Sequence, residues 1–346
     1  MGNMLVFLLI LGALVSFHEF GHLIVAKACG MKIDSYSIGF GKVLFKFKFG
    51  ETEYRISAIP LGGYVKQAGP NFLEDIKSDD PDKDRYFISK PVWQRALMVL
   101  AGPLFNFLFA IILASGIFYF MGVLNVTTVV GGVENNSPAE RAGVRMGDII
   151  VSVNDKEISD WRDIVMAIQV KENEKIKFGM KRENKVYDIF IIPEMKDQRL
   201  MVGISPVVER KSIGGIIPAL TEGTRRVAIE IAFQAKGLMQ MFQKKIPADS
   251  LGGPIMIYQV TKQVADEGWI ALIGLMILLN VALGFFNLLP IPPLDGGHIL
   301  FLAIETVLGK PLGKDAQVIM QTLGFGLLML VMLFATKNDL FRLFRK

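Results

Sequence analysis

Four long apolar runs dominate the pattern of hydrophobic and polar positions along this chain. They extend over residues 4–28, 96–121, 269–289 and 318–335. Each is close to the roughly 20 apolar residues that an α-helix needs to cross a lipid bilayer. The pattern therefore predicts an α-helical polytopic membrane protein with four transmembrane helices.

The first run has a second interpretation, because the sequence Ala-Lys-Ala at 26–28 resembles a signal-peptide cleavage site. However, no Lys or Arg precedes this run, and it carries His18, Glu19 and His22 near its end. A signal peptide has a basic start and an uninterrupted apolar centre. We therefore expect the run to be retained as a transmembrane helix.

The charges of the loops predict the orientation of the chain. The loop at 29–95 is rich in Lys and Arg, whereas no basic residue precedes the first span. By the positive-inside rule, this loop lies in the cytoplasm, and the N-terminus and the block at 125–268 lie outside. The basic tail at 336–346 conflicts with its resulting outside location. We give precedence to the first span, because it usually dominates.

An alternating pattern within the cytoplasmic loop predicts a β-hairpin at 42–58. Phe45, Phe47 and Phe49 alternate with lysines, and a second alternating run follows a Gly-Glu-Thr turn. The hairpin has more apolar surface than a solvated loop needs, so we expect it to enter the membrane. The charged stretch at 74–90 has no period and predicts a mobile connection.

The outer block divides into a mixed α+β unit at 126–195 and an amphipathic region at 205–268. In the first part, strand-like runs and one helix alternate with turns, and the unit is long enough to bury a small core. These elements are Val126–Val130, Ile149–Val153, Trp161–Ile168, Ile176–Met180 and Tyr187–Ile192. In the second part, apolar residues recur at helical spacing over 224–245. That helix lies on the membrane surface or packs against the outer unit, and the pattern leaves both open.

Composition agrees with a membrane protein, since 51% of the residues are hydrophobic and the mean hydropathy is +0.41. The net charge of +5 would also suit a nucleic-acid-binding protein. No basic cluster interleaved with exposed aromatic residues is found, so we expect no nucleic-acid partner and assign the charge to loops facing lipid headgroups. The one cysteine, Cys29, excludes an intrachain disulfide and a cysteine-based zinc site.

The first span contains the residues with the clearest chemistry, the sequence HEFGH at 18–22. On a helix, His18 and His22 share a face and can bind one metal ion, with Glu19 beside it. The pattern is short, and a hydrogen-bonded polar patch between helices is the alternative. Ionisable groups within a span are costly unless they have a partner or a function, and this favours the metal site.

A catalytic zinc ion usually takes three protein ligands, so a third is needed. Asp295 and His298 both qualify, and they follow the third span where prolines at 290–293 break the helix. The first and third spans run in the same direction, so their ends meet on the cytoplasmic side. The segment Pro-Leu-Asp-Gly-Gly is, by itself, equally consistent with a simple turn.

Together these residues resemble the site-2 protease family, RseP type, over nearly the whole chain. The resemblance rests on HEFGH, on the segment Asn287–Gly297 and on several further motifs. These are Ser37–Gly41, Pro60–Lys66, Gly102–Asn106, Gly253–Ile255, and the PDZ-like segments Asn136–Val144 and Gly147–Ile150. Family members often carry two PDZ domains, whereas this sequence has room and signal for one.

The resemblance implies a catalytic site with one Zn²⁺ ion. The implied ligands are His18, His22 and Asp295. It makes Glu19 the general base, and it favours Asp295 over His298 as a ligand. It implies that Asn287 contacts the substrate backbone or the oxyanion, that Asn106 also belongs to the substrate-binding residues, and that the hairpin is a re-entrant membrane element.

The implied function is that of a zinc-dependent intramembrane endopeptidase. It would hydrolyse peptide bonds within the transmembrane segments of single-span proteins after a first extracytoplasmic cut, as in regulated intramembrane proteolysis. Expected substrates are anti-sigma factors or signal-peptide remnants, and the expected location is the inner (plasma) membrane, with the active site near the cytoplasmic side. The PDZ-like domain would recruit trimmed substrates or exclude bulky ones.

Two other functions are consistent with parts of the sequence. A non-catalytic membrane scaffold would use the PDZ-like domain to bind partners, but it has no use for an intact HEFGH. A metal transporter would typically show internal repeats with matched broken helices, whereas this chain has one such break.

The predicted organisation combines these elements in one order along the chain. It comprises a first transmembrane helix (1–28), the cytoplasmic loop with its hairpin (29–95), a second helix (96–121), the extracytoplasmic PDZ-like domain (126–195), the amphipathic region (205–268), a third helix (269–289), a loop with the metal-ligand motif (290–317), a fourth helix (318–335) and the tail (336–346).

Overall fold

The computed structural model describes most of the chain as two compact units. The described residues are 2–69, 79–158, 161–169, 174–183, 185–196, 199–244 and 252–344. One unit consists of Met1–Ile117 and Ile216–Lys346, and the other is the insertion Phe118–Gly215. We describe each unit by itself and call them the membrane unit and the inserted unit.

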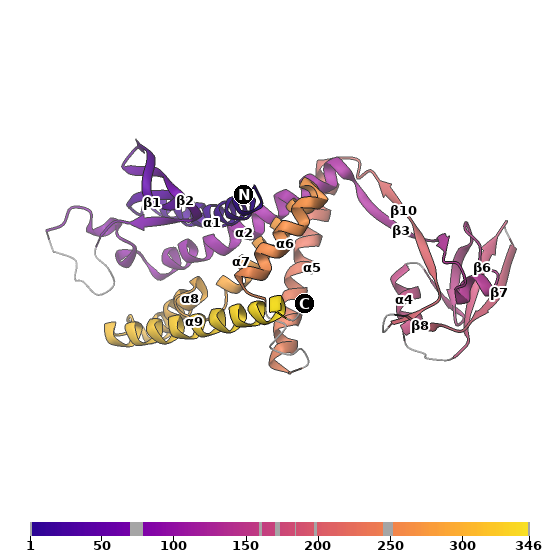
Figure 1. The fold of residues 1–346 in the computed structure, drawn as a ribbon. Helices are drawn as coiled ribbons and strands as arrows, with labels where there is room; N and C mark the ends of the chain where they lie inside the picture. The colour runs from indigo at the N-terminus through magenta and orange to yellow at the C-terminus, as the bar shows by residue number, and fades with distance from the viewer. Residues whose placement is uncertain are drawn as a thin grey trace. The chain divides into compact units, whose positions relative to one another are not determined.

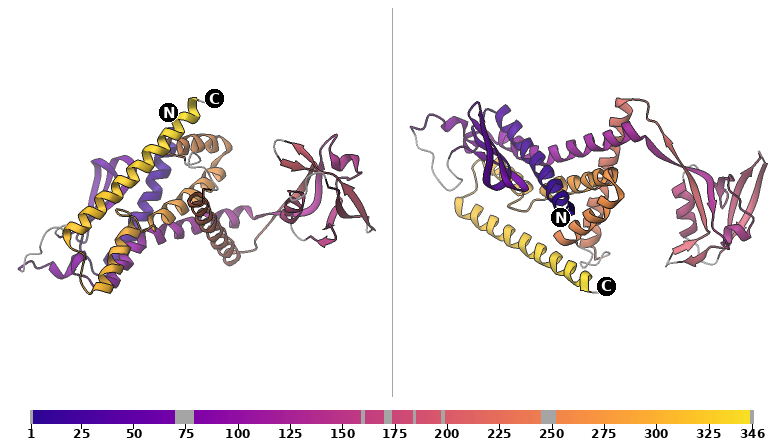
Figure 2. Two further views of the ribbon diagram at one scale, coloured as in Figure 1. Left: turned by 90° about the horizontal axis from the view of Figure 1, so that it is seen from below. Right: turned by 45° about the horizontal axis from the view of Figure 1, so that its top comes forward.

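The membrane unit contains the four predicted spans as helices of sufficient length and hydropathy. These helices are α1 (Gly2–Ala28), α2 (Val92–Met121), α7 (Trp269–Asn287) and α9 (Lys314–Phe344). The fourth is longer than predicted, because helical hydrogen bonding continues beyond the apolar stretch into charged turns at both ends. Only 11% of the apolar window of α9 is buried, and α9 runs along the outside of the unit (Figure 2). A long apolar helix so exposed is suited to contact with lipid.

The described residues of the membrane unit form three further α-helices. They are α5 (Ile216–Phe242), α6 (Pro254–Glu267) and α8 (Asp295–Leu308). Helix α8 lies within the segment 290–317, where we predicted only a loop. Its apolar residues at helical spacing favour this helix, and it begins directly after the prolines.

The hairpin of the membrane unit is longer than the predicted range of 42–58. Strands β1 (Ile33–Phe49) and β2 (Thr52–Gln67) pair in antiparallel fashion from Phe49–Thr52 at the turn back to Ile33–Gln67 at the base. The hairpin lies beside α1 (Figure 1). Its register is irregular, which obscures the two-residue period of its inner half. Its outer end exposes the phenylalanines that suggested membrane entry.

The charged connection before α2 is partly described. Residues 70–78 lie outside the described residues, whereas 79–90 include the short turns Lys83–Arg85 and Phe87–Ser89. Ion pairs from Lys32 to Asp82 and from Arg85 to Glu51 join this segment to the hairpin. The described part of the connection is therefore bound both beside the base of the hairpin, at Lys32, and at its turn, at Glu51, in contrast to the mobile segment that we predicted.

An apolar cluster at the base of the hairpin joins α1, β1 and α2. It contains Leu23, Ala26, Met31, Ile33, Tyr36, Phe87, Met98 and Val99. This cluster fixes the end of α1 that carries the two histidines against the start of α2.

The inserted unit is a β-sheet domain with two short helices. Its strands are β3 (Val123–Val133), β4 (Ile149–Val153), β5 (Lys156–Glu157), β6 (Ile176–Arg182), β7 (Lys185–Ile191), β8 (Glu194–Lys196), β9 (Arg199–Met201) and β10 (Ile204–Lys211), and its helices are α3 (Pro138–Arg141) and α4 (Trp161–Gln169). The main sheet has the order β10-β3-β4-β6-β7. The buried side chains of Ile150, Ile164 and Phe178 are at the centre of its core.

The inserted unit ends later than residue 195, where we placed the boundary of the predicted domain. Strand β10 pairs with β3 along most of its length, so residues 204–211 belong to this sheet and not to the amphipathic region. Pro206 and the charged end of β10 conceal the strand in the sequence, but both are acceptable in a strand at the edge of a sheet.

Candidate metal centre

Three potential metal ligands from two elements converge in the membrane unit. His18 and His22 lie one turn apart on α1, and Asp295 is the first residue of α8. His18 Nε2 is 3.0 Å from Asp295 Oδ2 and 3.2 Å from His22 Nε2. His22 Nε2 is 3.7 Å from Asp295 Oδ1. One ligand atom from each of the three residues lies within 4.8 Å of the others.

Both imidazole rings are held from behind by α2. His22 Nδ1 is 2.8 Å from the carbonyl oxygen of Met98, and His18 Nδ1 is 3.0 Å from the side-chain amide of Asn106. Metal-binding histidines usually have such a partner on the second nitrogen, because it fixes the tautomer and the ring orientation. The Nε2 atoms of both rings therefore face the common site.

The donor set fits a zinc ion. Two imidazole nitrogens and one carboxylate oxygen are a usual combination for catalytic zinc. Asp295 Oδ2 is buried and has no hydrogen-bond partner among the described residues, although it approaches His18 closely. A bound cation would explain this close, unbonded approach, because it attracts both donors at once.

Glycine at position 102 makes room for the two rings. A Cβ atom at Gly102 would lie 2.4 Å from His22 Nε2 and 2.7 Å from His18 Cε1. Gly21, between the two histidines, allows an equally close approach, since a Cβ there would lie 2.5 Å from the carbonyl oxygen of Ala101. Helices α1 and α2 can therefore touch at the site only because these residues lack side chains.

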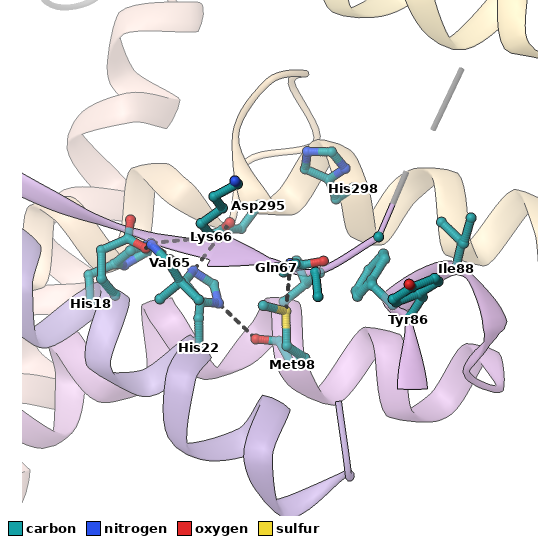
Figure 3. Close-up of a pocket in the computed structure, with 15 residues that line it drawn as sticks. His18, His22, Val65, Lys66, Gln67, Tyr86, Ile88, Met98, Asp295 and His298 are labelled. Atoms are coloured by element: carbon teal, nitrogen blue, oxygen red, sulfur yellow. Dashed lines mark hydrogen bonds and ion pairs between the residues drawn. The ribbon is translucent and has the colours of Figure 1, made fainter. Parts of the chain in front are cut away.

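A cavity of about 440 Å³ opens beside the three ligands. Figure 3 shows His18, His22 and Asp295 on one side of it and Tyr86 and Ile88 at its other end. Its lining residues are His18, Glu19, His22, Val65, Lys66, Gln67, Ala68, Gly69, Tyr86, Phe87, Ile88, Met98, Val99, Asp295 and His298. The cavity therefore connects the candidate metal site with the inner end of β2.

Glu19 is bound to this strand. The backbone N–H of Val65 in β2 donates a hydrogen bond of 3.1 Å to Glu19 Oε2. Glu19 lines the cavity beside the two histidines, so it can reach a water molecule there. The sequence motif gave no indication of the bond to Val65.

The other predicted site residues, His298, Asn106 and Asn287, lie outside the group of three ligands. His298 lines the cavity but is not one of the three grouped ligands. Asn106 is completely buried and does not line the cavity. Asn287, the last residue of α7, is half-buried and is also absent from the lining. The structure thus groups Asp295 with the histidines, and neither asparagine lines the cavity.

We did not single out Asn280 from the sequence, although it is fully buried in the third span. Its side-chain Nδ2 donates a hydrogen bond of 2.7 Å to the backbone carbonyl of Asn106. An amide in the middle of an apolar span usually has a structural or functional partner, and this rule would have identified it.

A family model and several known proteins match this chain along almost its full length. The model of peptidase family M50 matches residues 6–331. A protein of Clostridium acetobutylicum is 34% identical over 341 residues, covering 97% of each chain. The regulator of sigma-W protease RasP of Bacillus subtilis is 30% identical over 427 residues, covering 99% of each chain. The zinc metalloprotease RasP of Bacillus licheniformis has the same identity over 423 residues, covering 99% of this chain and 100% of the relative.

Among solved structures, the chain is similar to a PDZ domain of an SdrC-like protein of Listeria monocytogenes. The match has 20% sequence identity and a TM-score of 0.22, and it covers 25% of this chain and 92% of that domain.

Proposed function

The chain belongs to peptidase family M50 and is a zinc metalloprotease, and from this we propose that it cleaves single-span membrane proteins within their transmembrane segments. This family assignment confirms the resemblance to the site-2 proteases and favours a catalytic role over a non-catalytic scaffold. The observation that carries the proposal is the position of the ligands. Two of them lie inside an apolar helix that is long enough to span a bilayer, beside a cavity of about 440 Å³.

We assign His18, His22 and Asp295 as the ligands of one zinc ion. When bound, zinc supplies Lewis acidity, which activates water and polarises a carbonyl group. Glu19 accepts the proton of the attacking water and returns it to the leaving amine. For Asn287 we retain the role of a substrate contact, which requires the substrate to extend beyond the cavity toward the end of α7.

A substrate segment must leave its helical form before it can be cleaved, because a helix hides its peptide bonds in internal hydrogen bonds. The inner end of β2 provides an edge for an extended segment. Val65 directs its N–H toward the site and not toward β1, and the next residues of β2 line the cavity. We assign this edge as the place where substrate adds as a strand.

We place the protein in the inner (plasma) membrane, with the N-terminus and the inserted unit outside and the metal centre near the cytoplasmic side. The basic loop at 29–95 supports this orientation. The name of the Bacillus subtilis relative, a regulator of sigma-W, supports anti-sigma factors as substrates. The substrate would first be cut outside and then reach the membrane site.

Cleavage of a truncated single-span reporter in cells tests the proposal. Wild type is compared with Glu19→Gln at matched expression, because this change keeps the size of the side chain and all three ligands but removes the base. We expect cleavage by wild type and a loss of at least about 100-fold in the variant, within the usual range for a general base. Equal cleavage by both proteins, in cells that do not cleave the reporter without them, would contradict the role of Glu19.

A further inference from the structure

Asn106 is placed where it can act on the metal site without touching the substrate. It lies on α2, four residues after Gly102, and none of its surface is exposed. Its side-chain Nδ2 is 3.0 Å from His18 Nδ1. Its Oδ1 atom is buried and has no hydrogen-bond partner among the described residues. A buried amide oxygen without a donor is unfavourable, and most of all within a membrane.

The requirements of the metal ion decide which amide atom faces His18. His18 Nε2 is the nitrogen that faces His22 and Asp295, so Nε2 must keep a lone pair for the ion. A neutral imidazole has one N–H, which must then be on Nδ1. An amide N–H group facing this N–H would repel it, whereas the amide oxygen accepts it. Rotation of the amide by 180° exchanges the two atoms with little change in shape.

The second histidine already shows the same arrangement. His22 Nδ1 faces the carbonyl oxygen of Met98 at 2.8 Å, and a carbonyl can only accept a hydrogen bond. His22 therefore carries its proton on Nδ1 and directs a free Nε2 lone pair toward the site. Helix α2 would thus present one oxygen acceptor to each histidine, from positions two turns apart.

The third span holds Asn106 in place. Asn280 on α7 donates from Nδ2 to the backbone carbonyl of Asn106 at 2.7 Å, and Asn280 is itself fully buried. This bond links three spans in series, because α7 holds α2 and α2 holds the histidine of α1.

We propose that Asn106 is a positioning residue whose amide oxygen accepts the Nδ1–H of His18, and that Asn280 anchors it. This inference rests on the proposed zinc site, and it replaces the substrate-binding role that we predicted for Asn106 from the sequence. The two roles differ in what they affect. A positioning residue changes zinc affinity, whereas a substrate contact changes KM at full zinc occupancy.

Zinc affinity of the purified full-length protein, measured by competition with a chelator, tests the proposal without any substrate. Asn106→Leu removes the acceptor, and we expect zinc affinity to fall about 10- to 100-fold, as for other partners of metal-binding histidines. Asn106→Asp has only acceptors, so it should bind zinc within about threefold of wild type or more tightly. Ser115→Ala is the matched control, because it removes a buried hydroxyl from the same helix away from the site.

Two results would overturn the proposal. One is wild-type affinity in Asn106→Leu. The other is a loss of zinc affinity in a folded Asn106→Asp as large as that in Asn106→Leu, since this would mean that the amide donates to His18.

If the buried charge prevents Asn106→Asp from folding, the rescue of Asn106→Leu cleavage by added Zn²⁺ decides instead. Recovery of cleavage supports a positioning role for Asn106. A KM that stays elevated at full zinc occupancy contradicts that role. A protein that binds zinc as expected but cleaves no reporter would contradict the proposed function and leave the role of Asn106 intact.

Discussion

At Gly102, hydrogen is the only side chain that fits between α2 and the two histidine rings. Both rings are held by hydrogen bonds behind them and by the close contact of α1 with α2, so neither can move aside freely. The geometry of the candidate metal site thus depends on a residue that offers no ligand.

Gly102→Ala should therefore damage the metal site. Its Cβ would lie 2.4 Å from His22 Nε2, so the ring must move away from the position where it can bind zinc. We expect zinc affinity to fall at least about tenfold, comparable to the loss of a partner of a zinc-binding histidine. Zinc retention during dialysis against a chelator measures the effect.

Gly116→Ala is the control for this experiment, because a Cβ at that position of the same helix meets no atom within 4 Å. It should leave zinc retention unchanged and favour the helix slightly. Equal retention by the two variants would contradict the packing argument.

In the inserted unit, Asp148 is a buried carboxylate that links three segments. It accepts hydrogen bonds from Arg182, from Tyr187 and from the backbone N–H of Arg145. Burial raises the pKa of the Asp148 carboxyl, but these bonds, led by that from Arg182, outweigh burial and hold the pKa below its usual value.

Because this pKa is lowered on folding, Asp148 stabilises the inserted unit fully above the unfolded-state pKa of about 3.9. This contribution is lost as the pH falls through the lower folded-state pKa. We expect the loss to be about 1–3 kcal/mol, the range for hydrogen bonds to a charged group. Fluorescence of Trp161, in protein with Trp93 and Trp269 replaced by Phe, follows unfolding of this unit from pH 6 to pH 2.

Asp148→Asn cannot titrate, and it should flatten this part of the pH profile. An unchanged profile in that variant would assign the acid sensitivity to other groups.

Much of the candidate metal centre could be predicted at the residue scale, and the reasons are specific. Helical geometry alone places His18 and His22 on one face, and the cost of these groups within a span calls for a partner or a function. The residues alone could not separate Asp295 from His298, because the choice depends on where α8 begins. Nor could they show the bond from Val65 to Glu19, since it joins a helix to a strand 46 residues away.

At the scale of elements, α8 matters because it carries Asp295 in its first turn while its other end is fixed separately. Arg95, in the first turn of α2, donates from both terminal nitrogens to Glu305 near the end of α8. The side chains are only 11% and 14% exposed. This ion pair holds α8 against the helix that supports both histidines.

Glu305→Gln should therefore weaken the site from a distance. Removal of one partner leaves the charge of Arg95 buried and uncompensated. We expect this to lower the free energy of unfolding by about 3 kcal/mol. We expect lower thermal stability in detergent and faster zinc loss, although no ligand is changed. Adding Arg95→Met to this variant should restore part of the stability, because no uncompensated charge then remains.

Arg225→Met provides the comparison, since Arg225 forms an exposed pair with Glu222 on α5. This substitution should lower the free energy of unfolding by no more than about 1 kcal/mol. Equal effects of Arg225→Met and Glu305→Gln would show that the buried pair has no special role.

The helices were more predictable than the strands for a physical reason. A span must present about 20 apolar residues in sequence, so the chain itself contains the full signal. Strand pairing depends on partners that are distant in sequence. The outer half of the hairpin was evident from its alternating phenylalanines, whereas the irregular inner half, which includes Val65, was not. Strand β10 was missed because its partner β3 lies about 80 residues earlier.

At the scale of the whole molecule, the inserted unit enters and leaves through one pair of strands. Strand β3 begins directly after α2, β10 ends shortly before α5, and Val123 is paired with Lys211. Paired residues in antiparallel strands are only about 5 Å apart. The unit can therefore be excised between these positions with a short linker.

Deletion of residues 123–211 tests the role of the inserted unit in substrate selection. If the unit excludes bulky substrates, uncut reporters should be cleaved more than in wild type. If it recruits trimmed substrates, cleavage of trimmed reporters should fall. Zinc content should remain at the wild-type level in either case, because all proposed ligands belong to the membrane unit. Loss of zinc would show that the two units do not fold independently.

The pairing of Val123 with Lys211 also has an evolutionary consequence. A module whose two ends meet at one point can be lost, duplicated or replaced by recombination without changing the distance that its neighbours must span. Selection can therefore alter the inserted unit while the residues of the membrane unit stay under separate constraint. Lineages are then free to change this outer module independently of the helices that carry the proposed ligands.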